Sequence, residues 1–441
     1  MNSLHLIGIG GAGMSALARV LHGQGRVVSG CDRSEPAVAR LRAEGIDAVV
    51  GHAESHVQLG VDVGVSTAID SDSEELAEAR RLGLRILHRS EILAGIVASG
   101  RGICIGGAHG KTTTSALLAY LLSELGHDPT FLVGGDVSQL GTNARAGSGD
   151  LVVAEADESD GSLRVLRPAC AIVLNVELDH HDHYADESEL RALFSAWAQT
   201  LPADGLLVLG DGLEIAAPCT VVHAGVGEGE GWRALNPEPD GHGGTRFTLV
   251  RPSGERSQVT LGIPGEHNAG NAVAALAALD FACGDVDAAL PVLSRFRGAG
   301  RRFEHHGSVG GIRLVDDYAH HPTEVEATLR AARAVAQPGR LIACFQPHMA
   351  WRTLAFAREF GEALKLADAA CVCDVYTARG PADPGVSGAL VTGHSPGAVF
   401  TPGYDDAADW LAAQAKPGDL VITMGAGPVD SVISLLRERL A

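Results

Sequence analysis

The stretch GGAHGKTTT, residues 106–114, contains the residue types that bind nucleotide phosphates. The general phosphate-loop motif G-x-x-x-x-G-K-[ST] places a glycine six positions before its lysine, and Ile105 stands there instead. The stretch still follows an apolar, strand-like segment and precedes a helix-like one, which is the setting in which backbone N–H groups bind phosphate. We therefore predict a phosphate loop that is one residue shorter than the general motif.

The residue types in this loop predict how it binds ATP. Glycine at 107 and 110 lets the backbone N–H groups wrap around phosphate oxygens. Lys111 reaches the β- and γ-phosphates, and the Thr112 hydroxyl binds Mg²⁺. The predicted ATP-binding residues of the loop are Gly107, Ala108, His109, Gly110, Lys111, Thr112 and Thr113. Because such a lysine contacts mainly its ligand, we expect Lys111→Ala to abolish turnover without disturbing the fold.

Acidic side chains and histidines follow two predicted strands near the loop and are candidate metal ligands. They are Glu155, Asp157, Glu158 and Asp160 after the first strand, and Glu177, Asp179, His180 and His181 after the second. The carboxyl ends of parallel strands gather beside such a loop, and hard oxygen ligands suit Mg²⁺. A zinc site that adds His183 fits no familiar ligand spacing, and a solvated loop is the alternative for Asp160 and Asp182.

A second glycine-rich stretch, GIGGAG at residues 8–13, satisfies G-x-G-x-x-G between a predicted strand and a predicted helix. The predicted diphosphate and ribose ligands are Gly8, Gly10, Gly11, Gly13 and, at the end of the next strand, Asp32. Taken alone, this motif favours a NAD-dependent oxidoreductase, but that function leaves GKTTT unused. The motif is also compatible with a tight turn that binds no ligand, and both glycine-rich stretches are compatible with a nucleotide-binding regulator that lacks catalysis.

The elements that must position these residues follow from the hydrophobic pattern. Short apolar segments alternate with segments of helical period, which predicts parallel sheets covered by helices. We predict three α/β domains: a Rossmann-like domain over 1–98, a central P-loop ATPase domain over 99–297 and a Rossmann-like domain over 298–441. Short, turn-rich strands between 205 and 264 predict an antiparallel edge. In the third domain, helices are expected after Pro322 and around Phe356.

Composition excludes several classes of function. The formal net charge of −20 leaves no electrostatic footprint for nucleic acid or an anionic membrane. The eight cysteines stand mostly in apolar, strand-like runs, so we expect buried free thiols and not metal ligands. The start MNSLHLIGIGG lacks a signal-peptide pattern, and no apolar stretch is long enough to span a membrane. We therefore expect a cytoplasmic protein.

Nine motifs along the chain resemble those of one family. In order they are GIGGAGMSALA, GAHGKTTT, EADESDGS, DHHDHY, GEHNAGNA, GRRFE, DDYAHHPTEV, FQPH and a final GAG. Spread over essentially the whole chain, they resemble the motifs of the Mur ligases. The resemblance implies a first domain that binds a UDP-sugar, a central ATPase domain and a C-terminal domain that closes over the site. The GIGGAG stretch would then bind the UDP diphosphate.

The resemblance also implies roles for single residues. Glu155 and His180 would join Thr112 as metal ligands. Further ATP-binding residues would be His267, Asn268 and Asn271 near the adenosine and Arg302 near phosphate, the alternative being a helix N-cap at Asn268 and a buried amide at Asn271. Besides Lys111, the residues implied to face the reacting groups are Asp317, His320, His321 and Arg352, although on sequence grounds Arg352 can equally be a surface cation.

Within the family, the segment DESELRALFSAWAQT, residues 186–200, lacks a lysine that several branches carry, and so resembles the branch that uses L-alanine. The implied reaction joins L-alanine to the lactyl carboxylate of UDP-N-acetylmuramate through an acyl phosphate, in peptidoglycan precursor synthesis. A histidine of AHHP would accept the amine proton. A ligase that attaches a recycled tripeptide to the same UDP-sugar is the alternative.

The chain has a methionine, Met349, where many relatives have an arginine. The sequence does not decide between a monomer and a weak dimer.

Overall fold

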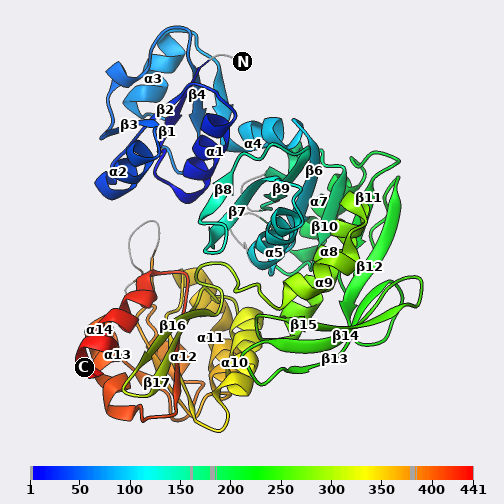
Figure 1. Cartoon of the computed structure of the whole chain (residues 1–441). Helices are drawn as coiled ribbons and strands as arrows, with labels where there is room; N and C mark the ends of the chain where they lie inside the picture. The colour runs from blue at the N-terminus through cyan, green and yellow to red at the C-terminus, as the bar shows by residue number, and fades with distance from the viewer. Residues whose placement is uncertain are drawn as a thin grey trace. The chain divides into compact units, whose positions relative to one another are not determined.

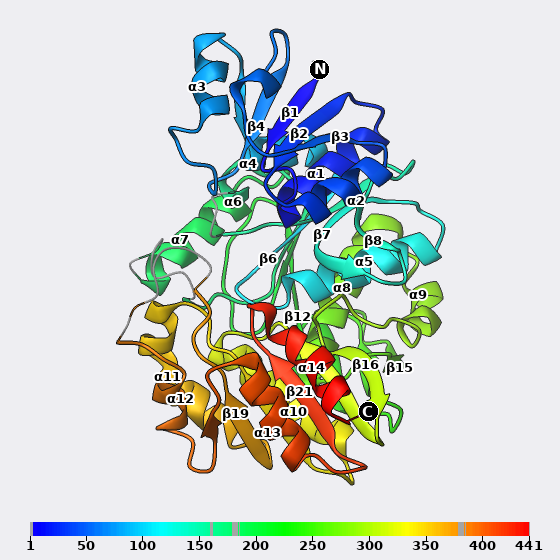
Figure 2. The same cartoon turned by 90° about the vertical axis from the view of Figure 1, so that its left-hand side faces the viewer.

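A computed structural model describes residues 3–158, 162–178, 184, 186–377, 383 and 385–440. The described residues form three sheets with helices against them (Figures 1 and 2). This confirms the predicted α/β class with three sheet-containing domains. Chain contacts divide the molecule into two units, which are described separately: Met1–Arg233 with Val250–Glu255 and Gly270–Val292, and Ala234–Leu249 with Arg256–Ala269 and Leu293–Ala441. The domain limits at 98 and 298 stay predictions.

The first sheet is parallel, with the strand order β3-β2-β1-β4-β5. Its elements are β1 (Leu4–Ile7), α1 (Ala12–Gly23), β2 (Val28–Asp32), α2 (Glu35–Ala43), β3 (Asp47–Val50), the 3₁₀ turn η1 (Glu54–His56), β4 (Asp62–Val65), α3 (Glu74–Arg81), β5 (Ile86–His88) and α4 (Arg89–Val97). All of β1 is buried, as expected for a central parallel strand covered on both faces. The strand order reverses at β1, where ligands bind in such sheets.

The second sheet carries the phosphate loop. Within the first unit its strand order is β12-β11-β10-β6-β9-β7-β8. Its elements are β6 (Arg101–Gly106), α5 (Lys111–Glu124), β7 (Thr130–Val137), β8 (Thr142–Arg145), β9 (Leu151–Glu155), α6 (Ser162–Val165), β10 (Cys170–Val173), α7 (Glu187–Ala198), β11 (Leu206–Leu209), β12 (Thr220–Val226), α8 (Glu266–Cys283) and α9 (Val286–Leu293). Strand β6 pairs in parallel with β9 and β10, which brings their carboxyl ends together.

The expected antiparallel edge over residues 205–264 is wrong for its first two strands. β11 pairs in parallel with β10, and β12 pairs in parallel with β11. Strand β11 (LLVL) is entirely buried, and a continuous apolar run of this kind suits a parallel strand inside a covered sheet. The later strands of this region are β13 (Trp232–Pro239), β14 (Thr245–Val250) and β15 (Arg256–Leu261).

The third sheet lies in the second unit, with the order β16-β17-β21-β18-β19-β20. Its elements are β16 (Glu304–Val309), β17 (Ile312–Asp317), α10 (Pro322–Ala336), β18 (Leu341–Phe345), α11 (Ala350–Leu364), β19 (Ala369–Val372), α12 (Ala389–Thr392), β20 (Val399–Phe400), α13 (Tyr404–Gln414), β21 (Leu420–Met424), the 3₁₀ turn η2 (Pro428–Asp430) and α14 (Ser431–Leu440). The helices expected after Pro322 and around Phe356 are present. β16 runs antiparallel to β17, whereas the inner strands are parallel.

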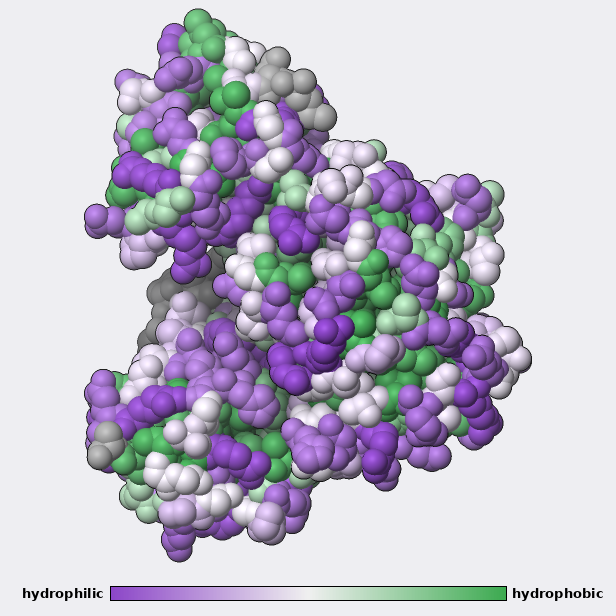
Figure 3. All heavy atoms as spheres, in the orientation of Figure 1, coloured by the Kyte–Doolittle hydropathy of each residue, from purple (hydrophilic) through white to green (hydrophobic). Residues whose placement is uncertain are grey.

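Two features of composition can be followed in the structure. All eight cysteines are free, and six of them are buried, as expected from their apolar surroundings. No described helix is long and apolar enough to cross a membrane, and hydrophilic side chains cover much of the face in Figure 3.

Candidate functional site

The loop between β6 and α5 has the geometry that its sequence predicts. Gly107 and Gly110 have positive φ angles of +131° and +84°, which other residues adopt at a cost. Gly110 directly precedes α5, so the loop presents backbone N–H groups at a helix N-terminus. A Cβ at Gly110 would also lie only 2.6 Å from Asn271 Oδ1, so Asn271 stands beside the loop. Glycine is therefore required here by both conformation and space.

The amide of Asn175 holds this loop from the end of β10. Its Nδ2 donates to the His109 carbonyl at 3.0 Å, and its Oδ1 accepts from the His109 N–H at 2.8 Å. The His109 imidazole lies 3.0 Å from a carboxylate oxygen of Glu177. No motif marked Asn175, although its position just after a buried strand is a signal that such a side chain meets the loop. His109 thus contributes to the shape of the loop through its backbone.

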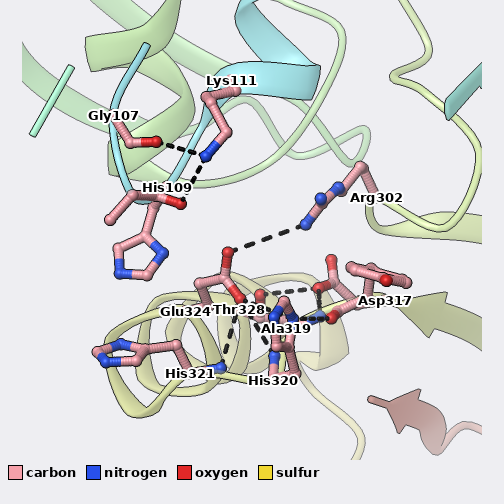
Figure 4. Close-up of polar contacts among 12 residues, drawn as sticks. Gly107, His109, Lys111, Arg302, Asp317, Ala319, His320, His321, Glu324 and Thr328 are labelled. Carbon is pink, nitrogen blue, oxygen red and sulfur yellow. Dashed lines mark hydrogen bonds and ion pairs between the residues drawn. The ribbon is translucent and has the colours of Figure 1, made fainter. Parts of the chain in front are cut away.

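Lys111 contacts several protein groups in this structure, and its role toward ATP stays a prediction. Its ammonium donates to the Gly107 carbonyl at 2.6 Å and to both carboxylate oxygens of Glu158 at 3.1 and 3.2 Å (Figure 4 shows the Gly107 contact). Glu158 is 2% exposed. Burial alone lowers the pKa of Lys111, but the charges of Glu158 and Asp157 outweigh it and hold that pKa above its usual value. Glu158 is therefore a lysine partner in this structure.

Thr112 and Glu155, both predicted metal ligands, face one small space. Gly134 of β7 donates its N–H to Glu155 Oε1 at 2.5 Å. A Cβ at Gly134 would lie 3.0 Å from each carboxylate oxygen of Glu155 and 3.1 Å from the Thr112 hydroxyl. Three oxygens, two from Glu155 and one from Thr112, thus surround the space that a side chain at Gly134 would fill. Hard oxygen ligands of this kind are the ones that Mg²⁺ prefers. His180, with Asp160, Asp179 and His181–His183, lies outside the described residues.

The first glycine-rich loop is fixed by the end of strand β2. Gly8 and Ile9 donate their N–H groups to the Cys31 carbonyl at 2.8 and 3.0 Å. Asp32 accepts from the Gly10 N–H at 2.9 Å and from the Ser34 N–H at 2.8 Å. Both Asp32 carboxylate oxygens therefore bind backbone, so this residue shapes the loop. A role toward a ribose hydroxyl stays a prediction, as do the roles of Gly11 and Gly13.

A cavity of about 240 Å³ in the first unit connects the two predicted ligand regions. Its lining includes Gly13 at the start of α1, Arg89 at the start of α4, and Gly134, Glu155 and Asp157 from the second sheet. The Arg89 guanidinium lies 3.7 Å from the Asp157 carboxylate and fills the place that a Cβ at Gly13 would occupy. The cavity therefore reaches from the first glycine-rich loop to Glu155. Arg89 carries no motif signal and is identified only by its position.

Asp317, predicted to face the reacting groups, binds backbone in the second unit. Its carboxylate accepts from the N–H groups of Phe303 and Ala319, both at 2.8 Å, and from the Thr328 hydroxyl at 3.3 Å (Figure 4). The residue is 7% exposed. Burial raises the pKa of Asp317 to about 6, against the opposing effects of the Arg302 charge and of the N–H donors. Asp317 is therefore a positioning residue that ties the loop after β17 to the segment around Phe303.

Glu324 organises the predicted histidine pair at the start of α10. Its carboxylate accepts from the backbone N–H of His320 at 3.1 Å and of His321 at 3.4 Å, and lies 4.0 Å from Arg302 (Figure 4). His320 Nδ1 lies 2.9 Å from the Tyr318 carbonyl, which can only accept, so Nδ1 carries the proton. In the neutral ring, Nε2 of His320 is then the basic nitrogen. His321 is buried against Phe356, with the ring centroids 5.1 Å apart.

Arg352 is a buried residue, so the alternative of a surface cation is wrong. It is 2% exposed, it lies over the Trp351 ring, and its Nη1 lies 3.1 Å from His348 Nδ1. The His348 ring lies 5.7 Å from the His320 ring and stacks on Tyr376. The structure thus joins Arg352, through His348, to His320. The FQPH motif contained His348, but only the fold identifies it as the link between these residues.

The residues predicted near the adenosine lie in the first turns of α8. The helix begins at Glu266, so the N-cap alternative for Asn268 is wrong. Its side-chain amide donates instead to the Pro264 carbonyl at 2.7 Å, and the residue is buried. His267 is exposed on the first turn. A nucleotide contact by any of these residues stays a prediction.

Comparisons with known proteins agree with this arrangement. Family models match residues 3–101 (Mur ligase family, catalytic domain), 105–279 (Mur ligase middle domain) and 301–427 (Mur ligase, glutamate ligase domain). The UDP-N-acetylmuramate–L-alanine ligases of Kineococcus radiotolerans and Renibacterium salmoninarum are each 45% identical to the chain. These matches cover 100% of the chain and 97% and 96% of the respective relatives.

A solved structure is similar over the same length. The UDP-N-acetylmuramate-alanine ligase of Thermotoga maritima matches with a TM-score of 0.84 and 26% identity. The match covers 100% of this chain and 99% of that one. The chain therefore has the fold of a solved ligase over nearly the whole length of both chains.

The buried pair of Lys111 and Glu158 leads to a prediction about stability. Lys111→Met should leave a buried carboxylate without its cation and should destabilise the nucleotide-free protein by about 3 kcal/mol. The double variant Lys111→Met/Glu158→Gln removes both charges and should recover most of that loss. Thermal unfolding of the two variants and the wild type measures the difference. Equal melting temperatures for Lys111→Met and the wild type would contradict the pairing.

The raised pKa of Asp317 leads to a prediction about pH. Since its folded-state pKa of about 6 exceeds the usual 3.8, the folded protein keeps a proton that the unfolded chain loses between these values. The stability contributed by this group is thus largest near pH 4 and falls as the pH rises to 6, by up to about 3 kcal/mol. Asn does not titrate, so the melting temperature of Asp317→Asn, relative to that of the wild type, should increase as the pH rises from 4.5 to 7. Asp280→Asn, at an exposed position, is the matched control. If the difference in melting temperature between Asp317→Asn and the wild type does not change with pH, the raised pKa of Asp317 is refuted.

Proposed function

Because this chain belongs to the Mur ligase family, we propose that it joins L-alanine to the lactyl carboxylate of UDP-N-acetylmuramate at the expense of ATP. The observation that carries the proposal is the full-length match, at 45% identity, to ligases whose names state this reaction. The protein is thus an ATP-dependent enzyme that forms an amide bond in peptidoglycan precursor synthesis. The geometry of the two residue clusters supports specific roles for their side chains.

The phosphate loop is the proposed ATP site. Its glycines leave the backbone N–H groups at the N-terminus of α5 open to the phosphates, and the helix dipole favours negative charge there. Lys111 stands at the loop with its ammonium already oriented by Gly107 and Glu158. A preoriented cation needs little rearrangement to neutralise the charge that develops during phosphoryl transfer. Asn271, beside Gly110, and Asn268, His267 and Arg302 are proposed as further nucleotide contacts.

Thr112 and Glu155 are the proposed ligands of Mg²⁺, and His180 is a third candidate. The oxygens of Thr112 and Glu155 converge on the space beside Gly134, which supports this assignment. When bound, the metal would offset the negative charge of the ATP phosphates. Gly134 acts by lacking a side chain, and its N–H orients the Glu155 carboxylate.

The UDP-sugar is proposed to bind at the first glycine-rich loop. The diphosphate can approach the backbone of residues 8–13, whose shape is set by Asp32 and Cys31. The cavity that runs from Gly13 to Glu155 would lead from this loop to the metal ligands. Arg89, on its wall, places a positive charge next to the proposed diphosphate.

The chemistry needs no enzyme nucleophile. The lactyl carboxylate attacks the γ-phosphorus, and ADP leaves. The amine of L-alanine then attacks the carbonyl carbon of the acyl phosphate, the C–O bond to the phosphate breaks, and inorganic phosphate leaves as the amide forms. Positioning and charge neutralisation supply most of the rate enhancement of such steps. His320 is the proposed acceptor of the amine proton, because its Nδ1–H binds Tyr318 and leaves Nε2 basic. Arg352, held by His348, is proposed to neutralise charge on the reacting carboxylate or phosphate, whereas Asp317 positions the loop.

The proposed Mg²⁺ site is tested by a substitution that fills the space between Thr112 and Glu155. Gly134→Ala should raise the Mg²⁺ concentration for half-maximal activity by about tenfold or more, because the new methyl group would crowd Glu155 and Thr112. Glu155→Gln should have a similar effect by removing a charged ligand. The exposed helical Gly95, where a Cβ meets nothing within 4 Å, supplies the control Gly95→Ala. Mg²⁺ dependence equal to the wild type in both test variants would rule out this site.

The acceptor is tested with UDP-N-acetylmuramate and ATP held constant. We expect fastest phosphate release with L-alanine and slower but measurable release with glycine and L-serine, since one methyl group discriminates by only about 1–3 kcal/mol. L-Ala-γ-D-Glu-diaminopimelate should be inactive. Preference for the tripeptide would instead assign the chain to the recycling reaction. Absence of release with every amine would contradict the ligase proposal itself.

A further inference from the structure

Four side chains in the first unit form a cluster that the proposed reaction does not use. They are Cys31 in β2, His52 after β3, His56 in η1 and Glu75 in α3. Cys31 Sγ lies 3.2 Å from Glu75 Oε1 and 3.4 Å from His52 Nδ1, which itself lies 2.9 Å from Glu75 Oε1. His56 Nδ1 lies 3.6 Å from the same carboxylate oxygen. Elements distant in sequence thus bring a thiol, an imidazole and a carboxylate together, and the second imidazole, His56, lies beside the carboxylate.

Hydrogen bonds alone do not account for this cluster, because some of its polar atoms are buried without a partner in the described part of the chain. Cys31 and Glu75 are both 0% exposed. Glu75 Oε2 and His56 Nδ1 are also buried, and neither atom has a hydrogen-bond partner among the described residues. Burying a carboxylate costs several kcal/mol unless its charge and its lone pairs are satisfied. The histidines are partly exposed, which leaves a route by which a small ion can enter.

The distances fit a tetrahedral metal site. With Zn–S near 2.3 Å and Zn–N and Zn–O near 2.0 Å, ligand atoms at tetrahedral angles are about 3.3–3.6 Å apart. The three separations among Cys31, His52 and Glu75 differ from that range by less than about half an ångström. A thiolate with imidazole and carboxylate ligands is a zinc donor set, because soft sulfur disfavours Mg²⁺ and Ca²⁺.

We propose that Cys31, His52 and Glu75 bind a zinc ion through three protein ligands, with a water molecule in the fourth position. This assignment departs from the expectation that all eight cysteines are plain buried thiols. The Cys31 thiol donates to Glu75 in this structure, and the ion would displace that proton and take the thiolate as ligand. The ion would also neutralise the buried charge of Glu75.

The cluster lies at the end of β2, next to the first glycine-rich loop, and an ion bound there would stabilise that part of the fold. The Cys31 carbonyl accepts from the N–H groups of Gly8 and Ile9, and the next residue, Asp32, accepts from Gly10. Zinc would therefore tie His52 and α3 to the strand end that shapes the first glycine-rich loop. A structural ion at this place stabilises the domain without contacting the reacting groups.

The test uses cobalt as a spectroscopic substitute for zinc on the full, chelator-treated and reduced chain. Co²⁺ should produce a thiolate-to-cobalt charge-transfer band and intense visible bands of tetrahedral geometry, at one equivalent, and Zn²⁺ should abolish both. Zn²⁺ should also raise the melting temperature. Absence of the charge-transfer band, or binding well below one equivalent, would overturn the proposal.

Variants distinguish this cluster from other thiols. Cys31→Ser should abolish the charge-transfer band, whereas Cys283→Ser should keep it; Cys283 is the matched control because it also lies near a histidine and a carboxylate, His127 and Asp285. Loss of the band in Cys283→Ser but not in Cys31→Ser would place the metal elsewhere and refute the proposal.

Two further variants guard against misfolding of Cys31→Ser. His52→Ala changes a partly exposed residue, and Glu75→Gln keeps an acceptor for the thiol and the Ala53 N–H. Each should lower zinc affinity by at least about tenfold, measured by competition with a chelator. If both bind zinc as tightly as the wild type, the cluster is a hydrogen-bonded network and no metal site.

Discussion

The placement of buried charge at the phosphate loop is the constraint on which the candidate site depends. A loop that must bind polyphosphate needs a cation, and the shape of this loop needs glycines with positive φ and a helix that starts at once behind them. The Lys111 ammonium cannot stay unpaired in such a buried place, and Glu158 supplies the opposite charge. The strand order, with β6 next to β9, brings the two together. The acidic residues at the end of β9 and just after it therefore have different roles: Glu158 pairs with Lys111, and Glu155 faces Thr112.

At the ends of several parallel strands, a polar side chain forms hydrogen bonds with the backbone of a neighbouring loop. Asp32 at the end of β2, Asn175 after β10 and Asp317 at the end of β17 each bind backbone N–H or carbonyl groups of a neighbouring loop. Backbone groups in a loop cannot pair with each other as they do in a helix or a sheet, so a short polar side chain at the strand end satisfies them. These hydrogen bonds restrain the conformation of the loops. They also explain why Asp32 and Asp317, which have the residue type of ligand-binding groups, are engaged with the protein itself.

Loops with a restrained conformation are what a ligase of this chemistry requires. Neither phosphoryl transfer nor amine attack needs a covalent enzyme intermediate, so most of the catalytic effect must come from oriented charges and dipoles. The carboxylates and amides that hold the loops fix those charges before substrate arrives. The cluster at Cys31 acts on the same strand end as Asp32, and its proposed ion would extend this restraint to the side of β2 that faces α3 and η1.

The sequence by itself determined the elements and the type of loop. The alternation of apolar and amphipathic segments predicts three covered sheets, because the period of each element is a local property, and GKTTT after a buried strand predicts a phosphate loop from adjacent residues. The tertiary structure alone decided which side chains meet. Glu158 with Lys111, Gly134 between Thr112 and Glu155, and Arg352 buried beside His348 all depend on helix packing or strand order. The parallel pairing of β11 and β12 was missed for the same reason. Hydrophobic period does not specify which strands become neighbours, since that is decided by the packing of segments far apart in the chain.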